Sequence, residues 1–173
     1  NNNNAWVIKG NTTNKRPLTT TGNLDSLVFD LSEDGANLIY TTNIIDTNDF
    51  FNQLWMIGTL EDSNPIQLTP TDVLYAEWKP TTDDTIAYST GEARELNPPW
   101  KPLNNLWLME IDRNSGRALD IEEIIPESSG GFYGWWGTDY KWSPQGDKMA
   151  WVRAGAMGIV DFANNELVTL VDY

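Results

Sequence analysis

The chain has 173 residues, with 25 acidic and 11 basic side chains and a formal net charge of −14. This length suits one domain with a real core, and the acidic balance argues against a protein that reads nucleic acid or binds an anionic membrane surface. With no cysteine and no histidine, the chain excludes disulfides, the usual zinc ligands and a Ser-His-Asp triad. No apolar run approaches the roughly 18 residues of a membrane span.

Short apolar runs rich in Val, Ile, Leu, Trp and Tyr alternate along the chain with clusters of Asn, Asp, Gly, Pro and Thr. This pattern is typical of strands and turns, not of helices. In chain order it predicts strands near residues 5–9, 15–19, 24–31, 36–42, 53–59, 65–69, 73–79, 85–90, 105–111, 117–121, 139–143, 148–154, 158–162 and 166–171. The sequence therefore predicts an all-β fold.

One repeated pattern combines an aromatic residue or leucine, a polar turn and an apolar run that ends in an aromatic residue. It occurs at residues 31–40, 78–88 and 142–151. Proline in Ser143-Pro144-Gln145-Gly146 should stop a strand, and the glycine lets the backbone reverse. The turn at residues 79–84 keeps the proline, loses the glycine and is one residue longer.

A second pattern of short apolar runs interleaves with the first, centred on Trp6, Trp55, Trp107 and Ile159. Successive spacings are 49, 52 and 52 residues. A period near fifty with several strands per repeat indicates stacked sheets of the propeller kind.

Together, the tryptophan, the Ser-Pro-Asp-Gly-like turn, the Leu-Trp-like strand and a closing Leu-Thr element resemble the repeats of TolB-type β-propellers. The closing element stands at Leu18-Thr19 and Leu68-Thr69, and as Val168-Thr169-Leu170 near the end. The resemblance covers nearly all of residues 1–173, which we interpret as a single propeller segment. It implies four-stranded antiparallel blades at about 24–69, 73–121 and 139–172, preceded by a half blade at 5–19. Because closed propellers usually have four to eight blades, we expect a partial propeller that belongs to a longer protein or a larger assembly.

Two insertions, at residues 91–104 and 122–138, lengthen the spacing from Trp78 to Trp142 to 64 residues, where 47 separate Leu31 from Trp78. Long loops on a rigid scaffold often carry binding sites. The aromatic residues of these insertions are our candidate ligand-binding residues: Trp100, Phe132, Tyr133, Trp135 and Trp136. They fit either a platform for a sugar ring or a peptide, or a lid that packs on the core or on an adjacent blade.

Other polar clusters carry weaker signals. Asp112, Asn114, Asp120 and Glu123 fall at calcium-loop spacing, but the sixth position holds Arg117 where such a loop needs glycine. Residues 112–116 therefore indicate a hairpin turn between two outer strands. No catalytic constellation stands out, and we expect no metal site and no cofactor.

Three functional hypotheses follow. The first is a non-catalytic TolB-like scaffold that binds a protein or another ligand, or packs against the remainder of its own propeller. The resemblance implies an extracytoplasmic bacterial location for it, periplasmic or at the cell surface. The second is the gating propeller of a prolyl-oligopeptidase-like serine peptidase, whose triad would lie in a separate hydrolase domain. The third is a carbohydrate-binding propeller that uses Trp135 and Trp136.

Overall fold

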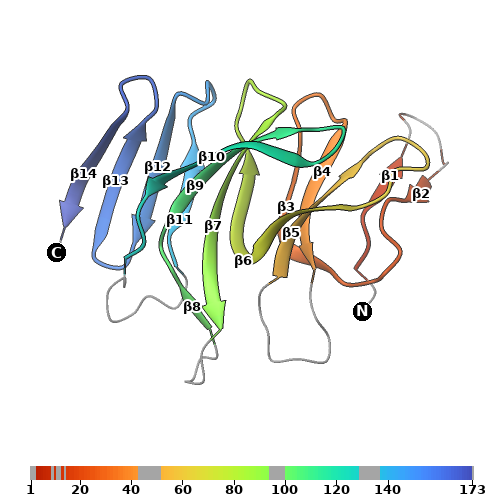
Figure 1. The fold of residues 1–173 in the computed structure, drawn as a ribbon, viewed down its shortest axis with the longest axis horizontal. Helices are drawn as coiled ribbons and strands as arrows, with labels where there is room; N and C mark the ends of the chain where they lie inside the picture. The colour runs from red at the N-terminus through yellow and green to blue at the C-terminus, as the bar shows by residue number, and fades with distance from the viewer. Residues whose placement is uncertain are drawn as a thin grey trace.

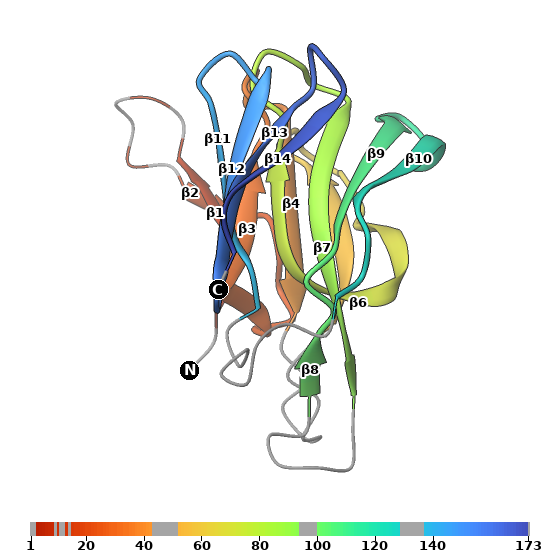
Figure 2. The same cartoon turned by 90° about the vertical axis from the view of Figure 1, so that its left-hand side faces the viewer.

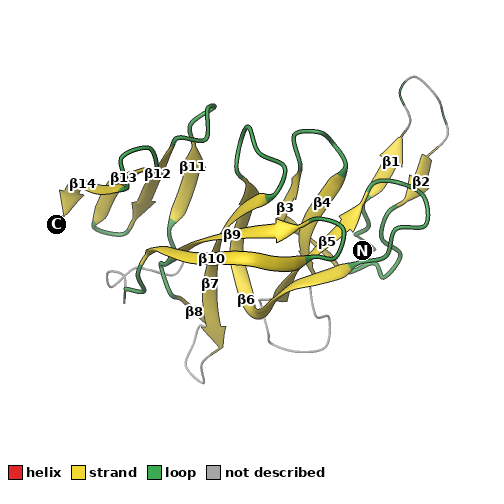
Figure 3. Cartoon of the chain, turned by 45° about the horizontal axis from the view of Figure 1, so that its top comes forward, coloured by secondary structure: helices red, strands yellow, loops and turns green. Residues whose placement is uncertain are grey.

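The computed structural model describes residues 3–8, 10, 13, 15–42, 52–93, 100–128 and 137–172. Within these ranges the chain consists of antiparallel strands and turns, as the sequence predicts, and no helix is long and apolar enough to cross a membrane (Figure 3). The strands are β1 (Trp6–Ile8), β2 (Lys15–Pro17), β3 (Leu24–Leu31), β4 (Asn37–Thr42), β5 (Asn52–Gly58), β6 (Ile66–Trp78), β7 (Thr85–Ala93), β8 (Trp100–Pro102), β9 (Leu106–Asp112), β10 (Arg117–Ile125), β11 (Asp139–Trp142), β12 (Lys148–Arg153), β13 (Ala156–Asp161) and β14 (Glu166–Asp172).

The strands form four groups that lie side by side along the longest axis of the molecule (Figure 1). We call them units A to D. Unit A is β1–β2, and unit D is the four-stranded sheet β11–β14. Unit B is β3, β4, β5 and residues 66–69 of β6, and unit C is residues 73–78 of β6 with β7, β9 and β10. Because β6 belongs to both, units B and C are joined in one sheet.

The continuous strand β6 differs from the two separate strands predicted at 65–69 and 73–79. Trp55 pairs with Gln67, and Gln53 pairs with Asp72, so the ladder skips the residues between them at a bulge. Pro70 lies in this bulge, where its missing N–H leaves no gap in the ladder. Proline therefore bends the chain here without ending the strand.

The sequence does not predict strand β8, because residues 91–104 lack the apolar alternation of a strand and are one of the two predicted loop insertions. It pairs with the far end of β7, where Gly91 lies opposite Pro102. The two strands form a hairpin that extends from the lower end of unit C (Figure 2). Strand β10 also continues to Ile125, beyond the predicted end at residue 121.

The hydrophobic core consists of three layers, one between each pair of neighbouring units. Leu38, Tyr40 and Ile57 of unit B face unit A. The second layer joins units B and C, with Ile39, Leu54 and Met56 packed in the cluster that contains Trp78 and Ile86. The third joins units C and D and contains Ala87, Leu106, Tyr140, Trp142 and Trp151. Each layer thus combines side chains of two neighbouring units, so the units are held together by their apolar faces.

The repeated Leu-Thr element has a structural role in units A and B. The hydroxyl of Thr69 accepts a hydrogen bond from the backbone N–H of Leu54 at 2.9 Å, and Thr19 does the same for Ala5 at 3.0 Å. Both threonines are buried, so each hydroxyl satisfies a backbone donor at the start of a neighbouring strand segment, and the Leu54 donor is itself buried.

Candidate functional site

The turns that open the repeat lie next to one another on one end of the molecule. In units B and D the Ser32 and Ser143 hydroxyls accept from the N–H of Asn37 and Lys148, at 2.9 and 3.0 Å. These bonds close the two turns, which explains why serine stands at the first position of the turn, directly after Leu31 and Trp142. The turn of unit C begins with Lys79 instead and is closed by backbone bonds between Lys79 and Thr85 and between Thr82 and Lys79.

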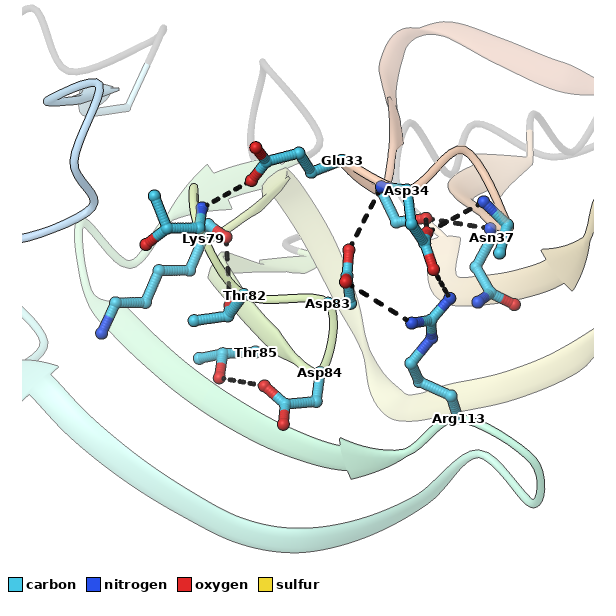
Figure 4. A network of polar contacts seen from close by, with 12 residues as sticks. Glu33, Asp34, Asn37, Lys79, Thr82, Asp83, Asp84, Thr85 and Arg113 are labelled. Atoms are coloured by element: carbon cyan, nitrogen blue, oxygen red, sulfur yellow. Dashed lines mark hydrogen bonds and ion pairs between the residues drawn. The ribbon is translucent and has the colours of Figure 1, made fainter.

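Side chains connect the turns of different units, as Figure 4 shows for units B and C. The N–H of Thr81 donates to Glu33 at 2.8 Å, and the N–H of Asp34 donates to Asp83 at 3.2 Å. Arg113, from the β9–β10 turn, contacts Asp34 at 2.7 Å and Asp83 at 3.9 Å. Because the contacts made by Glu33 and Asp34 link residues about fifty to eighty positions apart, in units B and C, we assign this network to holding the two units together.

Asp34 is the most strongly perturbed carboxylate of this network. The hydroxyl of Ser32 donates to it at 2.6 Å, and the N–H of Ala36 and Arg113 also donate. These bonds lower the pKa of Asp34 to about 2, with the Ser32 bond contributing most. The carboxylate is therefore ionised at neutral pH and already fully engaged in the turn.

A second group of polar side chains lies on the first strand of units B, C and D. Each of these residues directly precedes the aromatic residue or leucine that begins the repeat. The group consists of Asp30 on β3, Glu77 on β6 and Lys141 on β11. Asp30 accepts from the N–H of Trp78 at 2.8 Å, which ties unit B to the inner strand of unit C. Burial is the largest influence on Asp30 and raises its pKa above its ordinary value.

Glu77 lines a pocket of about 230 Å³ where the inner strands of units C and D meet. The rings of Tyr75 and Tyr140 lie 5.0 Å apart at its wall. The Tyr75 hydroxyl donates to Glu77 at 3.1 Å, and the Tyr140 hydroxyl donates to the carbonyl of Asn105 at 2.8 Å. Asp139 also lines the pocket. Strand alternation places Tyr75 and Glu77 on the same face of β6.

The electrostatics of this pocket favour a cation. Burial raises the pKa of Glu77 above its ordinary value, although Lys141 opposes the shift. Burial also raises the pKa of Tyr140 to about 12, so its ring stays neutral. Lys141 lies 3.9 Å from Glu77, but its side chain is 81% exposed, and such a surface pair contributes little. A partly desolvated carboxylate at the pocket wall can therefore bind an ammonium or guanidinium group.

Two buried asparagines, Asn104 and Asn105, directly precede β9 and bind the ends of both insertions. The sequence does not predict this pair. Asn104 donates to the carbonyl of Ser128 at 3.2 Å and accepts from the Thr138 hydroxyl at 3.0 Å. Asn105 accepts from the N–H of Thr90 at 2.9 Å. The only sequence signal is two adjacent polar residues immediately before the apolar run of β9.

The predicted ligand-binding residues lie largely outside the described part of the structure. Phe132, Tyr133, Trp135 and Trp136 are not among the described residues, and only the backbone of Trp100 is described, in β8. Their role in binding stays a prediction. The flanks of the two insertions do meet, because a Cβ on Gly137 would contact Pro102 at 3.0 Å. Gly137 also lines the Glu77 pocket.

The Asp112 segment forms the predicted hairpin turn between β9 and β10. Asp112 accepts from the N–H of Asn114 at 3.0 Å and from the Ser115 hydroxyl at 2.8 Å, and Gly116 has a φ of 67°. The carboxylate of Asp112 thus caps its own turn. These bonds hold its pKa below the ordinary value, with the Ser115 bond contributing most.

Comparisons with known proteins show the fold. No family model and no curated protein matches the chain. The chain resembles a solved puromycin hydrolase with a TM-score of 0.54 and 20% identity, over 90% of this chain and 23% of that one. It resembles the β-propeller domain of Cps50 (Swd1) from Myceliophteria thermophila with a TM-score of 0.51 and 15% identity, over 88% and 43% of the two chains.

A prolyl endopeptidase gives a third likeness, with a TM-score of 0.52 and 15% identity over 92% of this chain and 23% of that one. At these identities the likenesses show the fold alone. The chain therefore has the fold of part of a β-propeller, as the sequence predicts. It spans less than half the length of each of these three solved chains.

Proposed function

We propose that the chain is a non-catalytic, TolB-like propeller segment that binds a protein partner, and that the Glu77 pocket receives a basic side chain of that partner. The observation that carries the proposal is the half-buried Glu77 carboxylate beside the Tyr75 and Tyr140 rings. The net charge of −14 supports it, because an acidic protein attracts basic ligands over a distance.

Titration with penta-lysine, followed by NMR of the backbone amides, tests this proposal. We expect the largest shifts at residues 75–77 and 138–141. Glu77→Gln should weaken binding about fivefold, which corresponds to about 1 kcal/mol. Lys141→Met should strengthen it only slightly, because the variant removes an exposed cation whose pairing with Glu77 is weak.

Glu61→Gln is the matched control, since Glu61 is an exposed carboxylate in the loop between β5 and β6. If both glutamine variants weaken binding equally, penta-lysine recognises only the overall charge of the protein and the pocket has no specific role. Penta-glutamate should not bind.

A second candidate function is the propeller of a prolyl-oligopeptidase-like serine peptidase. The likeness in fold to a puromycin hydrolase and a prolyl endopeptidase favours it. In such an enzyme the propeller would control access to a triad on a separate hydrolase domain. The reading frame that encodes these residues distinguishes the two functions, because a downstream Gly-x-Ser-x-Gly segment supports the peptidase. A signal peptide with further repeats and no such segment supports the scaffold and the extracytoplasmic location that we propose with it.

A further inference from the structure

The wall of the Glu77 pocket contains four hydroxyl groups, which belong to Tyr75, Ser89, Thr138 and Tyr140. A hydroxyl has one proton to donate and lone pairs that accept. What the pocket offers a ligand therefore depends on which protein groups already receive the four protons.

The buried side chain of Asn104 fixes the proton of Thr138. This side chain contacts the carbonyl of Ser128 at 3.2 Å. Because a carbonyl only accepts, the amide nitrogen of Asn104 must face Ser128, which leaves the amide oxygen facing the Thr138 hydroxyl at 3.0 Å. The Thr138 hydroxyl must therefore donate to Asn104, and its lone pairs remain for the pocket.

Asn105 receives the protons of two further hydroxyls. The Tyr140 hydroxyl lies 2.8 Å from the backbone carbonyl of Asn105 and must donate to it, since this carbonyl cannot donate. The side-chain oxygen of Asn105 accepts from the backbone N–H of Thr90 at 2.9 Å, and the Ser89 hydroxyl donates to the same oxygen at 3.4 Å. The asparagine pair thus takes three of the four hydroxyl protons, although neither asparagine lines the pocket.

The Glu77 carboxylate takes the fourth proton and still has free acceptor capacity. Tyr75 donates to its Oε2 at 3.1 Å. Lys141 lies 3.9 Å from Oε1, beyond hydrogen-bond distance. A carboxylate can accept about four hydrogen bonds, and Asp139 adds a second carboxylate to the wall. Among the lining residues, all of which the structure describes, every side-chain donor is thus engaged, whereas side-chain acceptors remain free.

We propose that the pocket selects its ligand by N–H donors, so that it binds the primary ammonium of an unmodified lysine and rejects the trimethylated side chain. This inference rests on the proposed function and names the chemistry that the partner must have. A primary ammonium carries three donors and no acceptor, which matches a wall whose side chains offer acceptors only. Trimethylation keeps the positive charge and replaces all three N–H groups by methyl groups. A site that acted by charge or by cation–π contact would bind both forms.

Penta-lysine and the same peptide with every side chain trimethylated carry equal charge and test the proposal on the native protein. We expect the trimethylated peptide to bind about fivefold more weakly in isothermal titration calorimetry, because its hydrogen bonds to the wall are lost. This comparison needs no variant, so it does not depend on the folding of one.

Thr138→Val tests whether the wall carries the selection, because it removes one acceptor oxygen of the pocket. Penta-lysine should bind this variant more weakly and the trimethylated peptide equally well, so the ratio of the two affinities should fall. Thr90→Val is the matched control. Thr90 is also buried and its hydroxyl also contacts the Asn105 side chain, but it does not line the pocket. This control should keep the ratio of the native protein.

The selection and the proposed function fail in different ways. Equal binding of the two peptides, with weaker binding of penta-lysine to Glu77→Gln than to Glu61→Gln, would overturn the selection alone. Tighter binding of the trimethylated peptide would indicate a cation–π site and would also overturn it. The same holds for a preference for penta-lysine that Thr138→Val leaves unchanged. Absence of penta-lysine binding, or equal weakening by Glu77→Gln and Glu61→Gln, would overturn both.

Discussion

At the scale of single residues, the turn of unit C shows the consequence of a lost glycine. Gly35 and Gly146 have φ values of 70° and 69° in the turns of units B and D. The turn of unit C also needs a positive φ, and Thr81 supplies it at 67°. This conformation is unfavourable for a β-branched residue. The sequence showed that glycine was absent, but only the backbone angles show that the strain moved to Thr81.

Thr81→Gly should therefore stabilise the protein. Relief of the strain, worth about 1–2 kcal/mol, exceeds the extra entropy of glycine in the unfolded chain, which is roughly 0.5–1 kcal/mol. We expect the free energy of unfolding in urea to rise by about 0.5–1 kcal/mol. Thr82→Gly is the control and should destabilise, because the Thr82 hydroxyl donates to the Lys79 carbonyl at 3.0 Å. A loss of stability in the Thr81 variant would contradict the strain assigned to this residue.

Asp34 makes stability depend on pH in the acid range. Its pKa is about 2 in the folded protein against an ordinary value of 3.8. The contribution of ionised Asp34 to the free energy of unfolding is therefore present above about pH 4 and is lost as the pH falls toward 2. Asp34→Asn should be less stable than the native protein at pH 7, and the two stabilities should converge near pH 2. Urea unfolding between pH 2 and 7 measures this, and a constant difference would show that ionised Asp34 does not stabilise the turn.

At the scale of the elements, one pair of facing positions on neighbouring strands is filled in two ways. Tyr40 of unit B lies opposite Trp55, and Tyr88 of unit C lies opposite Trp107. In unit D the larger Trp151 lies opposite Gly158, where a Cβ would overlap the indole ring. Unit D therefore has one large ring at this pair where units B and C have two, and its glycine leaves the space that the indole of Trp151 occupies.

The turns of units C and D are also in direct contact, and two equivalent glycines test that contact. An added Cβ on Gly35 meets no heavy atom within 4 Å, whereas one on Gly146 would overlap the carbonyl oxygen of Pro80. Gly35→Ala should cost about 1 kcal/mol from the positive φ alone. Gly146→Ala should cost at least twice as much, because the turn of unit C must also move. Equal losses in the free energy of urea unfolding would show that the turns do not support each other.

At the scale of the whole molecule, each unit depends on the next for burial. Ile39 and Ala87 are fully buried because units C and D cover them, whereas the equivalent Ala150 of unit D is exposed. Large apolar side chains are exposed on the outer face of β3 as well. Stability in such arrays is close to a sum of units and their interfaces. These exposed apolar residues of units B and D therefore occupy positions that a neighbouring unit covers elsewhere in the molecule.

The sequence by itself determined the strand-and-turn alternation, the period near fifty and the turns at Ser32 and Ser143, because these depend on residues close along the chain. Only the tertiary structure decided which positions are buried, since Phe29 and Tyr140 share a repeat position and differ in what covers them. It also brought Tyr75 and Glu77 to Tyr140, and it placed Asn104, the last residue of the first insertion, against Ser128 and Thr138 of the second. It continued β6 through Pro70, where a bulge tolerates proline. Contacts between units join residues that are often about fifty positions apart in the sequence. Such contacts cannot be predicted from the pattern of neighbouring residues.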